Sequence, residues 1–195
     1  MTQRMLVFVL LALAAAAGGA LAQGTRPAVF AGAFYDGDPA RLAALVDGYL
    51  QKAPEPPAGA LEARLLICPH AGYIYSGATA ARAYRAVRGR SIETVVVVGT
   101  SHQYPLDGAS IYLQGAFETP LGTVPVDSAL AARIARASRF SYVAAAHEQE
   151  HSVEVQLPFI QRALPGARIV PIVLGYPTRA NVTALARGLA EALAE

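Results

Sequence analysis

Two of the four histidines in this 195-residue chain, His70 and His102, stand where histidines can bind a ligand. Each lies a few residues after an apolar run typical of a buried parallel strand. Open α/β sheets bind ligands beyond the carboxyl ends of such strands, where neutral imidazoles are good ligands for iron, copper or zinc. Tyr73 and Ser101 are candidates to orient a bound group. Spacing alone leaves open the alternative that each histidine is a loop residue hydrogen-bonded to backbone.

The other two histidines form the pattern His147-x-x-Glu150-His151, which matches a zinc-hydrolase motif. The motif needs one helix through all five residues, but no cap precedes His147 and Ser152 is typical of a helix start, so we favour a chance match. The alternative for Glu150 and Glu154 is a solvated helix N-terminus, where the helix dipole favours acids.

The elements that must position these residues alternate between strands and helices. Buried strands are predicted at Leu65–Cys68, Thr94–Gly99 and Arg168–Leu174, where Pro171 indicates an irregular or edge strand. Helices are predicted from Asp38 to Leu50, from Ser76 to Val87, from Asp127 or Ser128 onward, between His151 and Leu164 with a break near Pro158, and at Asn181–Ala194. The turn-rich segments Ala109–Leu113 and Phe117–Val126 indicate an antiparallel excursion at the sheet edge. The pattern predicts an α/β fold with a largely parallel sheet covered on both faces.

Composition excludes several classes of protein. With 54% hydrophobic and 15% charged residues the chain is expected to fold around a core rather than be disordered. The net charge of +2 is spread without runs, so no nucleic-acid partner is expected. Cys68 is the single cysteine, which excludes an intrachain disulfide, and we expect it to be a buried strand residue without a catalytic role.

The N-terminus resembles a secretory signal. Arg4 precedes an apolar segment that ends in an Ala20-x-Ala22 cleavage pattern, so residues 1–22 are predicted to be a signal peptide. The mature protein is then expected to be periplasmic or secreted. The alternative is that Met5–Ala22 is an uncleaved membrane anchor, since it is at the short edge of what spans a bilayer.

Four ordered motifs carry a resemblance to a known family. They are Pro69–Tyr73, Val96–His102, Phe117–Gly122 and Glu150–Phe159, and the opening Arg26–Val29 with Gly32–Tyr35 fits the same pattern. Together they resemble the Memo family, including the bacterial proteins called AmmeMemoRadiSam system protein B. The resemblance covers residues 26–195. It implies a three-layer α/β/α fold similar to that of the class III extradiol dioxygenases.

The resemblance also implies a non-haem iron or copper site. His70 matches the family's first metal-binding histidine and His102 the second, which supports the pair chosen from strand ends. Glu150 and His151 match a Glu-His-Ser motif that is expected to line the crevice. The family's remaining active-site elements come later in the family's sequences than the position matched by Glu195. We therefore expect no third metal ligand in this chain and a fold that is truncated at the C-terminus.

Three functions follow as expectations. The first is a metal-dependent dioxygenase-like or redox activity in the crevice. The second is a non-catalytic module that binds a peptide or small ligand there, which the missing third ligand favours. The zinc hydrolase comes last. Whether the protein is an enzyme, and its oligomeric state, are left open by the sequence.

Overall fold

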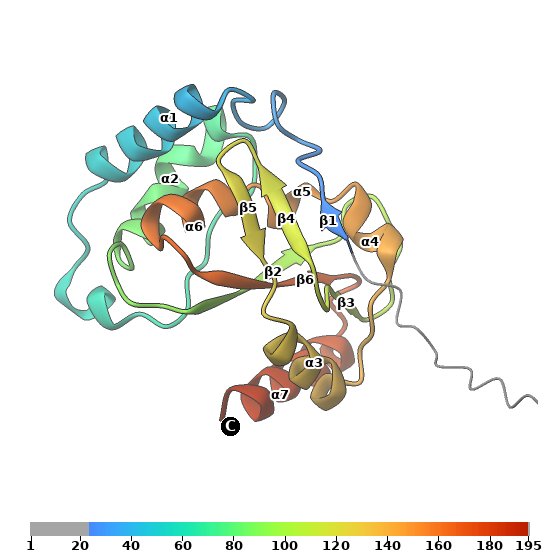
Figure 1. Ribbon diagram of the computed structural model, residues 1–195. Helices are drawn as coiled ribbons and strands as arrows, with labels where there is room; N and C mark the ends of the chain where they lie inside the picture. Colours follow the sequence, from blue (N-terminus) through green and yellow to red (C-terminus); the bar gives the residue numbers. More distant parts are fainter. Residues whose placement is uncertain (1–23, 195) are drawn as a thin grey trace, which may run out of the picture.

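The computed structural model describes residues 24–194, so the predicted signal peptide lies outside the described residues. At its centre is a three-stranded sheet in the order β2-β6-β3 (Figure 1). Strand β2 (Thr94–Thr100) runs parallel to β6 (Arg168–Leu174), and β3 (Ala109–Ile111) is antiparallel to β6. Residues 169–173 of β6 are all buried. An apolar run without alternation is what a strand covered on both faces requires.

Pro171 does not place its strand at an edge, contrary to the prediction, because β6 is the central strand of the sheet. Its carbonyl accepts a hydrogen bond from the Tyr112 backbone N–H at 2.9 Å, just beyond the end of β3. The N and C=O of one strand residue face the same side, so the missing N–H of Pro171 faces away from β2. No ladder bond to β2 is lost, and proline is tolerated there.

A smaller sheet contains β1 (Thr25–Arg26), β4 (Ala116–Thr119) and β5 (Gly122–Pro125). Strands β4 and β5 form an antiparallel hairpin as predicted, but in this separate sheet; at the edge of the central sheet the antiparallel strand is β3. Strand β1 pairs with β4 in parallel and so ties the start of the described chain to the hairpin.

Helices cover both faces of the central sheet, which confirms the α/β class. Helices α3 (Ser128–Ser138) and α7 (Arg179–Ala194) pack together on one side, while α1 (Pro39–Lys52), α2 (Tyr73–Arg85) and α6 (Leu157–Ala163) lie on the other (Figure 1). The predicted caps are present: the side chain of Asp38 accepts from Arg41 N–H, and that of Asp127 accepts from Leu130 N–H.

Other boundaries differ from the prediction. Helix α2 starts at Tyr73 rather than after Ser76, whose hydroxyl instead donates to the Ala71 carbonyl. A 3-10 helix, Ala58–Glu62, occupies part of the proline-rich loop. Two short helices that precede α6 are α4 (Ala144–Glu148) and α5 (His151–Glu154).

The predicted strand at Leu65–Cys68 is wrong, because these residues form an extended coil without a strand partner. Leu65 and Ile67 are 78% and 89% exposed, and β2 pairs with β6 alone within residues 24–194. Between the coil and β2 lies a cavity of about 510 Å³, lined largely by apolar side chains and reaching His70. The coil nevertheless delivers His70 to the end of the sheet.

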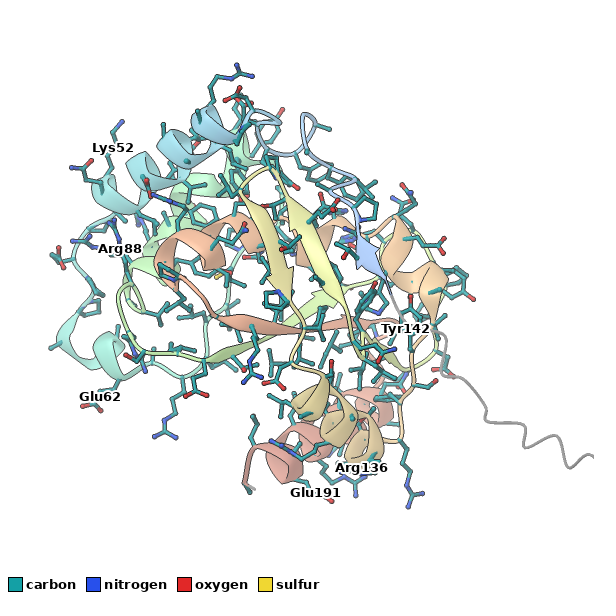
Figure 2. All side chains as sticks on the ribbon, viewed as in Figure 1. Lys52, Glu62, Arg88, Arg136, Tyr142 and Glu191 are labelled. Carbon is teal, nitrogen blue, oxygen red and sulfur yellow. The ribbon has the colours of Figure 1, made fainter. Side chains whose placement is uncertain are left out.

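Charged side chains are dispersed over the surface. Figure 2 shows Lys52, Glu62, Arg88, Arg136 and Glu191 projecting outward from separate elements, and all five are exposed. This mixture of signs agrees with the absence of charge runs in the sequence. No helix in the described part of the chain is both long and apolar enough to cross a membrane.

Candidate metal centre

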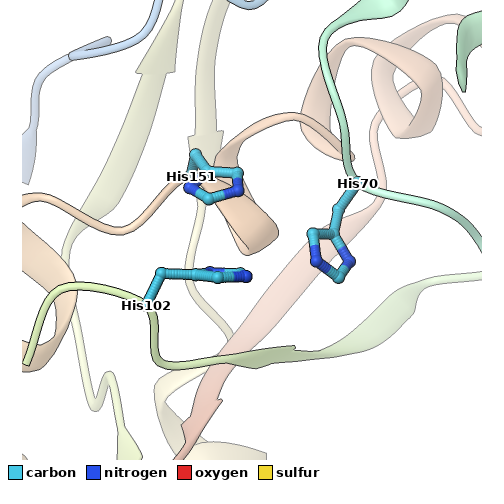
Figure 3. A group of neighbouring side chains, drawn as sticks. All are labelled: His70, His102 and His151. Carbon is cyan, nitrogen blue, oxygen red and sulfur yellow. The ribbon is translucent and has the colours of Figure 1, made fainter. Parts of the chain in front are cut away.

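Three histidines from distant parts of the chain meet beyond the carboxyl end of β2. His70 precedes α2, His102 follows β2, and His151 is the first residue of α5 (Figure 3). One ring nitrogen from each lies within 4.8 Å of the other two. The structure therefore joins the predicted pair, His70 and His102, to a third imidazole.

The donor set fits a transition-metal ion. Imidazole nitrogens bind such ions at about 2.1 Å, so two nitrogens on one ion are at most about 4.2 Å apart. The observed separations are within 4.8 Å, and small rotations of the rings shorten them to the range that one ion requires. Three imidazoles suit copper, iron or zinc, whereas magnesium and calcium prefer oxygen ligands.

The rings of the cluster pack against one another and against an aromatic wall. The His151 ring centroid lies 4.3 Å from that of His102 and 4.5 Å from that of Phe34, and His70 lies 5.2 Å from His102. Loss of hydration on burial lowers the pKa values of His70 and His151 below the usual histidine value. Both rings are therefore neutral near pH 7, which is the protonation state that binds metal. His102 is exposed and leaves one side of the cluster open.

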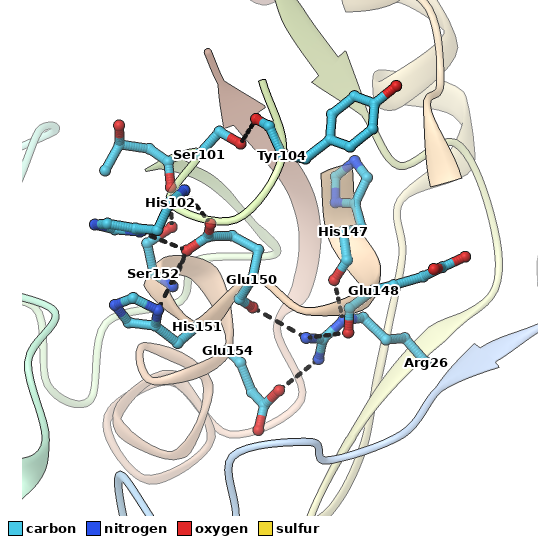
Figure 4. Close-up of polar contacts among 11 residues, drawn as sticks. Arg26, Ser101, His102, Tyr104, His147, Glu148, Glu150, His151, Ser152 and Glu154 are labelled. Carbon is cyan, nitrogen blue, oxygen red and sulfur yellow. Dashed lines mark hydrogen bonds and ion pairs between the residues drawn. The ribbon is translucent and has the colours of Figure 1, made fainter. Parts of the chain in front are cut away.

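The carboxylate of Glu150 holds the loop that carries His102 against the start of α5 (Figure 4). Its Oε2 accepts the backbone N–H of His102 at 2.7 Å, and its Oε1 lies 2.9 Å from His102 Nδ1 and accepts Ser152 N–H at 2.8 Å. Burial alone would raise the pKa of this carboxyl, but the hydrogen bonds from Ser152 and His102 lower it below its usual range. Glu150 is therefore an ionised acceptor in the interior.

A second buried carboxylate, Glu154, anchors α5 from the other side. It receives Arg26 Nη1 at 2.5 Å, the Tyr35 hydroxyl at 2.6 Å and the backbone N–H of Phe30 at 2.8 Å. Arg26 also donates to the carbonyls of residues 147, 148 and 150, as Figure 4 shows in part. The start of the described chain thus fixes the turn that carries His151.

The solvated alternative for Glu150 and Glu154 is wrong. Their side chains are 2% and 0% exposed, because each is paired with groups that are distant in sequence. Local patterning cannot distinguish an acid that faces solvent at a helix start from one that accepts N–H groups of other segments. The partners that are distant in the sequence determine that these two acids lie in the interior.

The structure adds a third candidate ligand where the sequence predicted none, because His151 completes a three-histidine cluster. Its sequence position beside Glu150, in a motif expected to line the crevice, is the signal that could have found it. Tyr73 and Ser101 have other roles. The Tyr73 hydroxyl donates to the Val155 carbonyl within the core, and the Ser101 hydroxyl donates to the Tyr104 carbonyl in the loop that carries His102.

The structure does not form the zinc-hydrolase motif. Helix α4 ends at Glu148 and α5 begins at His151, so no single helix presents both histidines. His147 is 2% exposed, its Nε2 lies 2.9 Å from Ser110 Oγ, and its ring contacts Tyr112. Burial, with a smaller contribution from the nearby Arg26 charge, lowers the pKa of His147 to about 3. This placement agrees with the prediction from the sequence that the motif match is due to chance.

Comparisons with known proteins identify the family. The family model described as Memo-like protein matches residues 26–195. A MEMO1 family protein of Methanothermobacter thermautotrophicus is 43% identical over 167 residues, covering 80% of this chain and 60% of its own length. One of Pyrococcus furiosus is 39% identical over 176 residues, covering 87% of this chain and 60% of its own, and a memo-1 homolog of Caenorhabditis elegans is 37% identical over 154 residues, covering 77% and 43%.

The chain therefore spans about 60% of the length of the first two relatives. The matched region includes the segments that carry all three clustered histidines. By the family model and by these identities, the chain belongs to the Memo-like protein family.

Proposed function

We propose that this protein binds one iron or copper ion through His70, His102 and His151. The observation that supports this is the meeting of three ligand nitrogens within 4.8 Å on an open side of the molecule. When bound, such an ion supplies Lewis-acid or redox chemistry to a small ligand in its open coordination positions. The chain's own residues supply the three imidazole rings, the buried carboxylate of Glu150 that holds His102, and the aromatic wall of Phe34.

Copper(II) is expected to bind more tightly than iron(II), because the affinities of nitrogen sites follow the Irving–Williams order. Which ion is present in cells then depends on metal supply. A dioxygenase-like reaction on a small chelating substrate is the activity that the open side of the cluster favours, since His102 is exposed there.

Metal content and affinity test this proposal. Purified protein, loaded with iron(II) under anaerobic conditions or with copper(II), is analysed by elemental mass spectrometry and titrated by calorimetry. We expect one ion per chain, and loss of binding in each of the variants His70→Ala, His102→Ala and His151→Ala. The variant His147→Asn is the matched control, because this histidine lies outside the cluster, and it is expected to keep the ion.

Sub-stoichiometric metal in the unaltered protein would refute the proposal, as would binding that survives loss of any clustered histidine. Circular dichroism of each variant separates a lost ligand from a lost fold. If the ion is bound, oxygen consumption with catechols is the first activity assay.

The cavity beside His70 favours a second candidate, a module that binds an apolar small molecule or peptide without turnover. Its volume of about 510 Å³ is in the range of small-molecule sites, and Cys68, Val95 and Val97 are among the residues that line it. Calorimetric titration with ligand pools, with and without chelator, separates the two functions. Binding that is unchanged by the chelator would favour the module.

A further inference from the structure

One buried carboxylate contacts two members of the histidine cluster. Glu150 Oε1 lies 2.9 Å from His102 Nδ1 and 3.6 Å from His151 Nδ1, while its side chain is only 2% exposed. Both oxygens of this carboxylate also accept backbone N–H groups, those of His102 and Ser152. Glu150 therefore connects the loop after β2 to the first turn of α5 (Figure 4).

This contact determines which nitrogen of His102 carries the proton. An ionised carboxylate can only accept hydrogen bonds, so an unprotonated Nδ1 at 2.9 Å would set two lone pairs against each other. In the neutral form, which is the form that binds metal, the ring therefore carries its proton on Nδ1 and donates it to Glu150. The lone pair of Nε2 is left free, and it is the only ligand atom that His102 can then offer.

We propose that Glu150 is a positioning residue that fixes His102 in the tautomer with a free Nε2 and holds that ring beside His151. The inference rests on the proposed metal function and gives Glu150 a role within it. Carboxylates that receive the second N–H of a metal-binding histidine orient the ring and strengthen the ligand.

The isosteric variant Glu150→Gln discriminates between positioning and simple support of the fold. If its amide oxygen replaces Oε1, its NH₂ group faces the backbone N–H of His102, donor against donor. If the amide flips, its NH₂ group faces Nδ1, which must then accept, and the ring proton moves to Nε2. In the first orientation the backbone contact to His102 is lost. In the second the contact to Nδ1 is reversed, and the Ser152 N–H that Oε1 accepts faces a donor, although the side-chain volume is unchanged.

The matched control is Glu148→Gln, which removes a carboxylate charge from an exposed side chain two residues before Glu150. Two readouts are compared for the unaltered protein, Glu150→Gln and Glu148→Gln. The first is the tautomer of His102 in metal-free, ¹⁵N-labelled protein, measured by long-range ¹H–¹⁵N correlation and assigned with His102→Ala. The second is the affinity for copper(II), measured by calorimetry against a competing chelator.

We expect a proton on Nδ1 of His102 in the unaltered protein and in Glu148→Gln, and a population with the proton on Nε2 in Glu150→Gln. The affinity of Glu150→Gln for copper is expected to fall by 10- to 100-fold, the range seen when such partners are removed. The control is expected to keep the affinity within about 2-fold.

The two proposals fail in different ways. If the unaltered protein binds no copper, the metal function fails, while the tautomer measurement still decides whether Glu150 orients His102. If copper binds but Glu150→Gln keeps both the affinity and the Nδ1 proton, the positioning role is overturned. If Glu150→Gln does not fold, the metal-free unaltered protein decides alone, because a proton on Nε2 of His102 would overturn the inference.

Discussion

The ion pair between Arg26 and Glu154 gives the most quantitative prediction. Their side chains are 4% and 0% exposed, and the N–O distance is 2.5 Å. The substitution Glu154→Gln keeps the volume of the side chain but leaves the Arg26 guanidinium buried without a counter-charge. Removing one partner of a buried pair costs about 3–5 kcal/mol.

The size of this loss is measurable by urea unfolding. For a domain of this size, with an m value of about 2 kcal/mol/M, a loss of about 4 kcal/mol lowers the urea midpoint by about 2 M. Circular dichroism at 222 nm follows the transition. The control Glu148→Gln, at an exposed position at the end of α4, is expected to change the free energy of unfolding by less than about 0.5 kcal/mol.

A second substitution isolates the cause. Adding Arg26→Met to Glu154→Gln removes the buried charge, so the double variant is expected to regain part of the lost stability. It regains only part, because Arg26 also donates to three carbonyls of the α4–α5 turn. A loss below about 1 kcal/mol in Glu154→Gln, or a double variant less stable than Glu154→Gln, would refute the account of a paired interior charge.

Three further predictions concern groups around the site. Burial holds the pKa of His147 at about 3 in the folded protein, against about 6.5 in the unfolded chain, so the unfolded chain binds the proton first as the pH falls. The contribution of His147 to stability is therefore full above about pH 6.5 and falls towards pH 3 by up to about 1.4 kcal/mol per pH unit. The urea midpoint of His147→Asn is expected to fall less steeply over this pH range than that of the unaltered protein. Gly99→Ala would press its Cβ against the Ser152 hydroxyl and within 2.9 Å of Val153 Cγ2, so a loss of about 1–3 kcal/mol is expected, and an unchanged melting temperature would contradict it. Burial raises the pKa of the Cys68 thiol to about 11, so alkylation by iodoacetamide at pH 8 should be roughly 100-fold slower than for free cysteine and should recover in urea; equal rates would contradict the burial.

Much of the local structure could be predicted from the sequence because its signals are local. Asp38 with Pro39, and Asp127, mark helix starts through hydrogen bonds that span only a few residues. The valine run of β2 and the turn residues of the β4–β5 hairpin are equally short-range. These elements confirmed the α/β class.

The failures come from partners that lie far away in the chain. Leu65–Cys68 has the composition of a buried strand, but a strand needs a neighbour to pair with, and apolar content does not reveal one. The burial of Glu154 depends on Arg26, 128 positions earlier. The joining of His151 to His70 and His102 likewise arises only when three segments dock, which no spacing rule predicts.

The docking of Arg26 onto the α4–α5 turn has a consequence for the order of folding. Its contacts span 121 to 128 residues, so their loop-closure entropy is lost before the turn that presents His151 is fixed. The histidine cluster is therefore expected to assemble late, after the local helices and the hairpin. If the cluster binds a metal ion as proposed, the ion binds only the completed tertiary structure, and bound metal is expected to slow the detachment of residues 24–35.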